Sequence, residues 1–140
     1  MPREDFLLKE IEKIGLILTA IRQKLFGGKD NLSITIEQDI QDAKGKLSNE
    51  MNFDLDKFLN LPTQEANEYI SQFKRFGISN LELLASIISE MGFNTHSENS
   101  KLYLEKALQL YEFCELTDKT YSFERQDNIN RIKSRLIIPG

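Results

Sequence analysis

The 140-residue sequence contains few side chains that could carry out nucleophilic or metal-dependent chemistry. Its single histidine, His96, lies in a predicted loop, and its single cysteine, Cys114, lies on the apolar face of a predicted helix. Nucleophilic catalysis needs a serine or cysteine activated by a neighbouring base, and burial makes a thiol less reactive. One histidine and one cysteine also cannot supply the ligands of a structural zinc site. We therefore predict a protein that is not an enzyme, with no catalytic residue, no metal and no cofactor.

Two other segments resemble ligand-binding motifs, but each has a simpler explanation. Residues 27–30, Gly-Gly-Lys-Asp, lack the full glycine spacing of a phosphate-binding loop and follow no predicted strand, so we interpret them as a helix end. Carboxylates cluster between residues 37 and 42 and at Asp54 and Asp56, without the Glu-x-x-His pairs of di-metal bundles. We interpret these carboxylates as helix caps and a solvated acidic face.

The last predicted helix carries a basic stripe, which consists of Arg125, Arg131, Lys133 and Arg135. Such a stripe could bind RNA or an acidic protein. Cations near the C-terminus of a helix are also favoured by the helix dipole, so a solvated face is the simpler interpretation. The net charge of -4 and the pI near 5.1 argue against general nucleic-acid binding, which needs a basic field to offset phosphate charge.

The composition is that of one folded domain in a reducing compartment. Hydrophobic residues make up 40% and charged residues 29% of the chain, which is enough apolar surface for one core. The longest apolar stretch, residues 14–20, is shorter than the roughly 20 residues that span a bilayer. With one cysteine and no leader-like segment at the start, the sequence predicts a cytoplasmic protein without a membrane span.

Apolar residues recur at helical spacing along the whole chain. Over residues 3–26 they follow intervals of four and three, at Leu7, Ile11, Ile14, Leu18, Ile21 and Leu25. Further helices are predicted from Asn31 or Ser33 to Met51, despite Gly45, and between Asp54 and Pro62, where Phe53 should pack on Phe58. One predicted helix starts at a Thr63 cap and ends at Gly77, and the next starts at a capping box in residues 79–82 and ends at Gly92. Two more are predicted from Thr95 or Ser97 past Cys114, and from Ser122 to Pro139.

These patterns predict an all-α fold of about six to seven antiparallel helices. No alternation of apolar and polar residues lasts long enough for a strand, and residues 33–36 are better explained as a helix start. No linker rich in Pro, Gly or Ser divides the chain. We therefore predict a single domain, 1–140, with N-terminal amphipathic helices in residues 1–60 and helical hairpins in residues 63–137.

Residues 81–113 resemble one hairpin of the tetratricopeptide repeat. The resemblance is carried by Leu81, Leu84, Ala85, Ile88 and Gly92, followed by Leu104 and the run Glu-Lys-Ala-Leu at residues 105–108. Ile88 replaces the usual aromatic residue, Ser100 replaces a common alanine, and the loop 93–100 is about three residues longer than in the motif. The resemblance implies a superhelical arrangement of the C-terminal half, whereas small-residue packing in any helical hairpin would produce a similar pattern.

The chain as a whole is also similar to uncharacterised bacterial all-helical proteins, described as domains of unknown function. The similar parts are the segment Asp-Phe-Leu-Leu-x-x-Ile at residues 5–11 and the segment Lys-Ala-Leu-x-Leu-Tyr at residues 106–111. This resemblance implies a helical fold and supplies no activity.

If the repeat register holds, four side chains lie on the groove side of its first helix: Glu82, Ser86, Ser89 and Glu90. They form an acidic, small-residue surface that suits a basic peptide. We therefore expect a non-enzymatic scaffold or adaptor that binds a peptide or another protein.

Two alternatives remain open from the sequence. The helix over residues 3–26 has apolar residues around much of its circumference, which could support a homodimer. The C-terminal basic stripe could bind RNA or an acidic partner, with the steep salt dependence that such binding shows.

Overall fold

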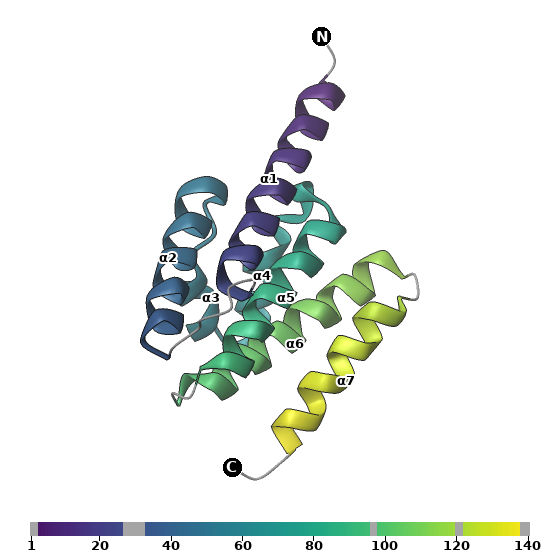
Figure 1. Cartoon of the computed structure of the whole chain (residues 1–140). Coiled ribbons are helices and arrows are strands. Elements are labelled where there is room, and N and C mark those ends of the chain that lie inside the picture. Colours follow the sequence, from purple (N-terminus) through teal and green to yellow (C-terminus); the bar gives the residue numbers. More distant parts are fainter. Residues whose placement is uncertain (1–2, 27–32, 96–97, 120–121, 138–140) are drawn as a thin grey trace.

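The computed structural model of the chain describes residues 3–26, 33–95, 98–119 and 122–137 (Figure 1). These residues form seven α-helices and one short 3₁₀ helix and contain no strand, so the predicted all-α fold is confirmed. The elements in chain order are α1 (Arg3–Phe26), α2 (Ser33–Met51), α3 (Leu55–Asn60), α4 (Thr63–Ser71), η1 (Lys74–Phe76), α5 (Ile78–Asn94), α6 (Asn99–Asp118) and α7 (Phe123–Ile137).

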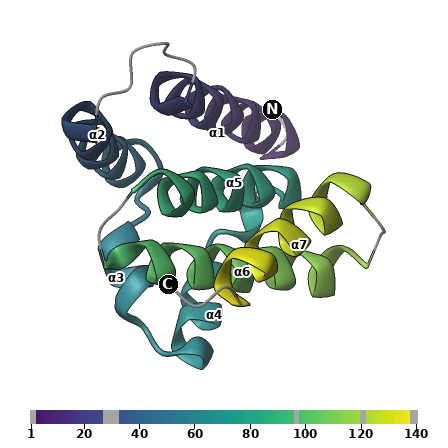
Figure 2. The ribbon, with the colours of Figure 1, turned by 60° about the horizontal axis from the view of Figure 1, so that its bottom comes forward.

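Helices α5 and α6 form an antiparallel pair at the centre of the molecule. Helix α1 packs on α5, α2 packs on α1, and α7 packs on α6 and α5. The short helices α3 and α4 pack on α6, on the side away from α1 (Figure 2). The N-terminal part of α1 extends beyond the other helices (Figure 1). Most side chains of α5 are buried because α5 touches neighbours on several sides.

The local signals for helix ends were partly right. The Asp54 carboxylate accepts a hydrogen bond from the Lys57 backbone N–H, and Phe53 packs on Phe58 with ring centroids 5.6 Å apart, as predicted. The Ser122 hydroxyl likewise caps α7 by accepting from the Arg125 N–H. The residues expected to end α1 and to begin α2, Gly27, Gly28 and Asn31, lie outside the described residues.

Four other predicted helix ends were wrong. Pro62 is the N-cap of α4, so Thr63 is already helical, and α4 ends at Ser71 with η1 between it and Gly77. Residues 79–82 do not form a capping box, because Gly77, with its positive φ of 92°, is the N-cap and α5 starts two residues earlier. The helix also runs through Gly92 to Asn94 instead of ending at Gly92.

Gly92 allows α5 and α6 to approach closely. A Cβ atom at this position would lie 2.7 Å from Leu104 Cγ and 3.1 Å from the Ser100 carbonyl oxygen. The Ser100 hydroxyl donates a hydrogen bond to the Gly92 carbonyl, a backbone acceptor near the end of α5. The alanine that the repeat motif commonly has at this position could not make this hydrogen bond. The predicted hairpin is present, but one antiparallel pair fits many helical folds, so the tetratricopeptide arrangement stays a prediction.

Polar side chains also fix the contacts around this pair. The buried Asn80 amide donates hydrogen bonds to the Ile11 carbonyl on α1, at 2.9 Å, and to the Phe76 carbonyl, at 2.8 Å. On the opposite side of the molecule, the buried Lys106 ammonium donates to the Leu61 carbonyl that follows α3. Burial lowers the pKa of Lys106, and the carbonyl at the C-terminus of α3 offsets part of that cost. These contacts place α1 and the α3–α4 corner against opposite sides of the central pair.

The close approach at Gly92 predicts opposite effects for two glycine-to-alanine substitutions. Gly92→Ala should lower the free energy of unfolding by about 1–3 kcal/mol, because the new methyl group overlaps Leu104 and the Ser100 carbonyl. Gly45→Ala, in the exposed interior of α2 with no atom near the added Cβ, should raise it by about 0.5–1 kcal/mol. Urea unfolding followed by circular dichroism measures both values. A Gly92→Ala protein as stable as the unsubstituted chain would contradict this account of the α5–α6 contact.

Candidate functional site

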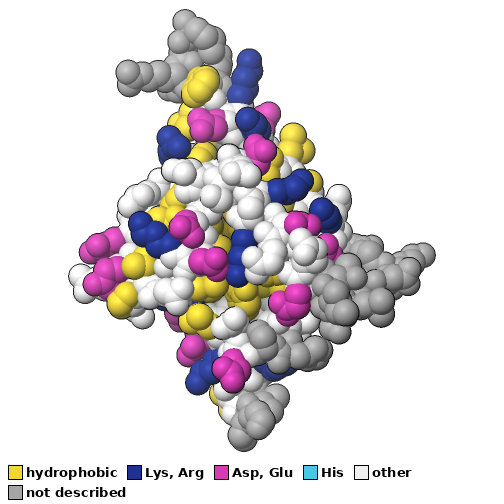
Figure 3. Space-filling view, turned by 90° about the vertical axis from the view of Figure 1, so that its left-hand side faces the viewer, with side chains coloured by type: hydrophobic (Ala, Val, Ile, Leu, Met, Phe, Trp, Pro, Cys, Tyr) yellow, Lys and Arg dark blue, Asp and Glu magenta, His cyan; other side chains and the backbone are white. Residues whose placement is uncertain are grey.

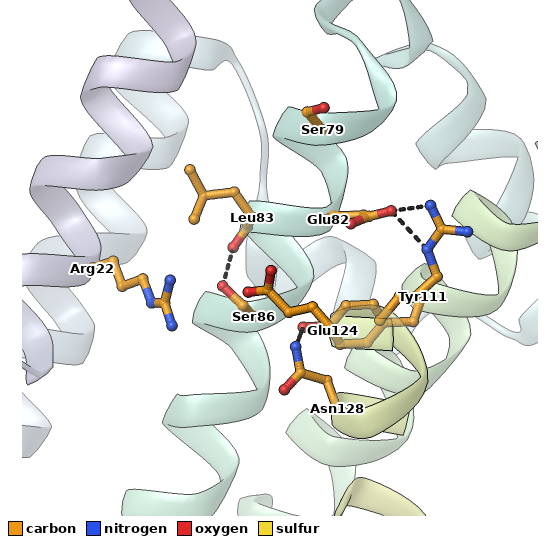
Figure 4. A pocket seen from close by; sticks show the side chains of 9 residues that line it. Arg22, Ser79, Glu82, Leu83, Ser86, Tyr111, Glu124 and Asn128 are labelled. Atoms are coloured by element: carbon orange, nitrogen blue, oxygen red, sulfur yellow. Dashed lines mark hydrogen bonds and ion pairs between the residues drawn. The ribbon is translucent and has the colours of Figure 1, made fainter. Parts of the chain in front are cut away.

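A polar pocket lies on α5 between α1 and α7. Its volume is about 240 Å³. We call it the α5 pocket, and its lining residues are Arg22 of α1; Ser79, Glu82, Leu83 and Ser86 of α5; Tyr111 of α6; and Glu124, Arg125 and Asn128 of α7 (Figure 4). Helix α1, from the start of the chain, and the three successive helices α5, α6 and α7 therefore each contribute side chains to one site.

The four residues predicted on the groove side of the hairpin occupy different environments. Glu82 and Ser86 line the α5 pocket. Glu90 lies one helical turn beyond Ser86 on the same face of α5 and pairs with Arg131 at 2.7 Å. Ser89 is buried, and its hydroxyl donates to the Ser86 carbonyl at 2.8 Å. The structure thus brings Glu82 and Ser86 together in the pocket, while Glu90 lies beyond it and Ser89 faces the interior; their role in binding stays a prediction.

Glu82 belongs to an ionic network with a buried arginine. The Arg125 side chain is 2% exposed, and its Nε donates to Glu82 Oε1 at 2.6 Å while Nη2 donates to Asp118 Oδ2 at 2.9 Å. Burial by itself would lower the pKa of Arg125, but the hydrogen bonds from Glu82 and Asp118 outweigh burial and raise the pKa. This network joins α7 to α5 and to the end of α6.

Of the basic stripe predicted as a solvated face, Arg131, Lys133 and Arg135 are exposed, whereas Arg125 is not. Arg125 is buried in the network with Glu82. Arg131 pairs with Glu90, and its guanidinium lies 4.0 Å from the centroid of the Phe93 ring, with Arg135 at 5.9 Å from the same ring. The interpretation of Arg125 as a solvated residue was therefore wrong, because its cation is needed to balance the carboxylates beneath α7.

Tyr111 and Asn128 form a polar pair in the α5 pocket. Tyr111 is 1% exposed, and its hydroxyl oxygen accepts a hydrogen bond from Asn128 Nδ2 at 3.1 Å (Figure 4). Burial raises the pKa of Tyr111 well above its usual value. The hydroxyl therefore keeps its proton, and can donate a hydrogen bond, at any physiological pH.

The mouth of the pocket carries opposite charges. Arg22 extends from α1 and Glu124 from α7, and both side chains are exposed (Figure 4). Together with the Arg125 and Glu82 pair, the lining has two cations and two carboxylates, so its formal charges balance. Sequence reasoning missed Arg22, Tyr111 and Asn128, since nothing in their local pattern shows that three different helices meet there.

Among the described residues, the others considered for chemistry do not form a second candidate site. Cys114 is fully buried, and burial raises the pKa of its thiol to about 12, so the thiolate is scarce at neutral pH. His96 and residues 27–30 lie outside the described residues. Within the described ranges no three His, Cys, Asp or Glu side chains are placed to hold a metal ion. No helix in those ranges is both long and apolar enough to cross a membrane.

A larger hollow of about 460 Å³ lies where the α3–α4 corner meets α6 and the end of α7. Leucines make up much of its lining, and Lys106 is its buried charged group. The ammonium of Lys106 already donates to the Leu61 carbonyl and to Gln109 Oε1, and Gln109 in turn donates to the Thr63 carbonyl. These groups serve to hold the corner, so the α5 pocket is the stronger candidate site.

Comparisons with known proteins do not assign the chain to a family. No protein-family model, curated protein or solved structure matches it. The bacterial origin and the repeat family suggested by the sequence therefore stay predictions.

The buried network predicts that two arginines of the basic stripe differ strongly in their effect on stability. Arg125→Met should lower the free energy of unfolding by about 3 kcal/mol, since it leaves Glu82 and Asp118 without their buried partner. Arg131→Met, at an exposed ion pair, should change it by less than about 1 kcal/mol. Chemical denaturation measures the two values. Equal losses of unfolding free energy would show that the burial of Arg125 does not increase its contribution to stability.

Proposed function

We propose that this protein is a non-enzymatic scaffold or adaptor that binds a peptide segment of a partner protein along α5, between α1 and α7. The observation that carries the proposal is the α5 pocket, where side chains from four helices surround one polar hollow. No cysteine or histidine lies among its lining residues, and the Ser86 hydroxyl donates to the Leu83 carbonyl of its own helix. Such a site suits recognition of a ligand better than chemical conversion of one.

The charges of the site narrow the kind of peptide. Glu82 and Glu90 are already paired with Arg125 and Arg131, so a basic peptide would have to compete with arginines of the same chain. The charges at the mouth, on Arg22 and Glu124, are of opposite sign. A peptide that is polar or of mixed charge therefore fits the site better than the basic peptide expected from the sequence.

Site-specific crosslinking tests whether a partner binds in the pocket. A photo-crosslinking amino acid in place of Ser79, an exposed residue of the pocket, should capture a defined partner protein from a cell extract. The same amino acid in place of Ser48, exposed on α2, is the matched control and should not capture it. Mass spectrometry identifies the crosslinked peptide, and Glu124→Lys, at the exposed mouth, should reduce its yield several-fold. Identical captured proteins from positions 79 and 48 would contradict the proposal.

A second candidate function is self-association through α1. Several large apolar side chains of this helix are exposed: Phe6 by 70%, Leu8 by 56% and Leu16 by 73%. Figure 3 shows hydrophobic side chains among charged ones at the upper end of the molecule, where Figure 1 places α1. Exposed apolar surface of this kind favours contact with another protein surface, and a second copy of the chain carries the same residues.

Light scattering after gel filtration tests self-association. A chain that dimerises through α1 should show twice the monomer mass at tens of micromolar. Leu8→Glu combined with Leu16→Glu should restore the monomer while the circular dichroism spectrum stays helical, because both side chains are exposed. Ile14→Glu is unsuitable, since Ile14 is buried in the core. A monomer at all concentrations would exclude this function.

A further inference from the structure

The polar pair in the α5 pocket retains hydrogen-bonding capacity that the described part of the chain does not use. Asn128 Nδ2 donates to the Tyr111 hydroxyl oxygen at 3.1 Å. Among the described residues, no group accepts the hydroxyl proton of Tyr111 and none donates to Asn128 Oδ1. The pair therefore offers at least one donor, the Tyr111 O–H, and one acceptor, Asn128 Oδ1, to the pocket.

This capacity does not depend on the orientation of the Asn128 amide. Rotating the amide by half a turn would let the Tyr111 O–H donate to Asn128 Oδ1. The amide N–H₂ would then supply the donor and the Tyr111 oxygen the acceptor. In both orientations the pair can bind a group that contains an acceptor next to a donor.

The charges around the pair favour a neutral ligand group. Arg22, Glu82 and Glu124 all act electrostatically on the Tyr111 hydroxyl, and their effects are of mixed sign. An anion would be attracted by Arg22 and repelled by Glu124, and a cation would experience the reverse. Burying an ion without a dedicated partner is costly, whereas a neutral polar group needs only its hydrogen bonds.

We propose that the α5 pocket binds a primary carboxamide, the side chain of an asparagine or glutamine in the bound peptide. The carboxamide oxygen accepts a hydrogen bond from the Tyr111 O–H, and its N–H₂ donates to Asn128 Oδ1. Leu83, in the wall of the pocket, contacts the methylene groups of the ligand. This inference rests on the proposed function, and it adds the chemistry that the peptide must present.

A fragment titration tests the ligand chemistry with the full chain. Propionamide is added to ¹⁵N-labelled protein, and sodium propionate and propylammonium chloride serve as anionic and cationic controls of similar size. We expect saturable shifts of the backbone amide signals of Ser79, Leu83, Ser86 and Asn128, with a Kd of about 1–50 mM for so small a ligand. Each charged control should bind at least about fivefold more weakly, because a buried charge lacks a partner.

Two matched substitutions separate a binding role for Tyr111 from a structural one. Tyr111→Phe keeps the ring and removes the hydroxyl, and it should weaken propionamide binding by about five- to tenfold. Tyr103→Phe removes a hydroxyl from another buried tyrosine of α6 that does not line the pocket, and it should leave binding unchanged. If Tyr111→Phe fails to fold, Asn128→Ala, at a half-buried position, removes the partner atom instead and should produce the same weakening.

Specific outcomes would overturn the inference. Tighter binding of propionate, unchanged binding by Tyr111→Phe, or no saturable shift with propionamide would each reject a carboxamide site. Equal binding of N-methylacetamide would assign the pocket to a peptide backbone unit instead of an Asn or Gln side chain. Capture of a partner at position 79 without propionamide binding would reject the carboxamide and leave the proposed function intact. Propionamide binding without any captured protein would reject the proposed function alone.

Discussion

The close contact between α5 and α6 at Gly92 is the constraint on which the rest of the molecule depends. A side chain there would overlap Leu104 and approach the Ser100 carbonyl, so only glycine lets the two backbones come this close. The axes of α5 and α6 set the positions of α1, α3, α4 and α7, which all pack on this pair. Because protein interiors are densely packed, a displacement at Gly92 would be transmitted to every helix that lines the α5 pocket.

Helix α7 is attached by a different kind of interaction from the rest of the fold. Ile129 and Ile132 are its buried apolar residues. Its buried Arg125 forms ion pairs with Glu82 and Asp118. Burying an arginine is costly unless its hydrogen bonds are satisfied, and here two carboxylates from two helices satisfy them. Because these carboxylates are paired with Arg125, they attract a basic ligand less strongly. The attachment of α7 thus changes the α5 surface from an acidic face to one with balanced charge.

The α5 pocket combines this balanced charge with a buried tyrosine that keeps its proton. Arg22 and Glu124 face solvent at its mouth, while Tyr111 and Asn128 lie where α6 meets α7. Neutral hydrogen-bonding groups gain most in such a site, since neither sign of charge is favoured. This combination accounts for the preference that we propose for a neutral carboxamide over a charged group.

The sequence by itself determined the helical class, the number of helices to within one, and the apolar stripe of α1 from Ile14 to Leu25. These features follow from the spacing of apolar residues that are close in the chain. The sequence also determined local ends such as the Asp54 cap, whose partner lies three residues away. Only the tertiary structure decided that Gly92 lies inside a helix contact, that Arg125 is buried, and that Tyr111 and Asn128 meet in one pocket. The partners in these interactions come from different helices, and their distances depend on packing that no local pattern of residues records.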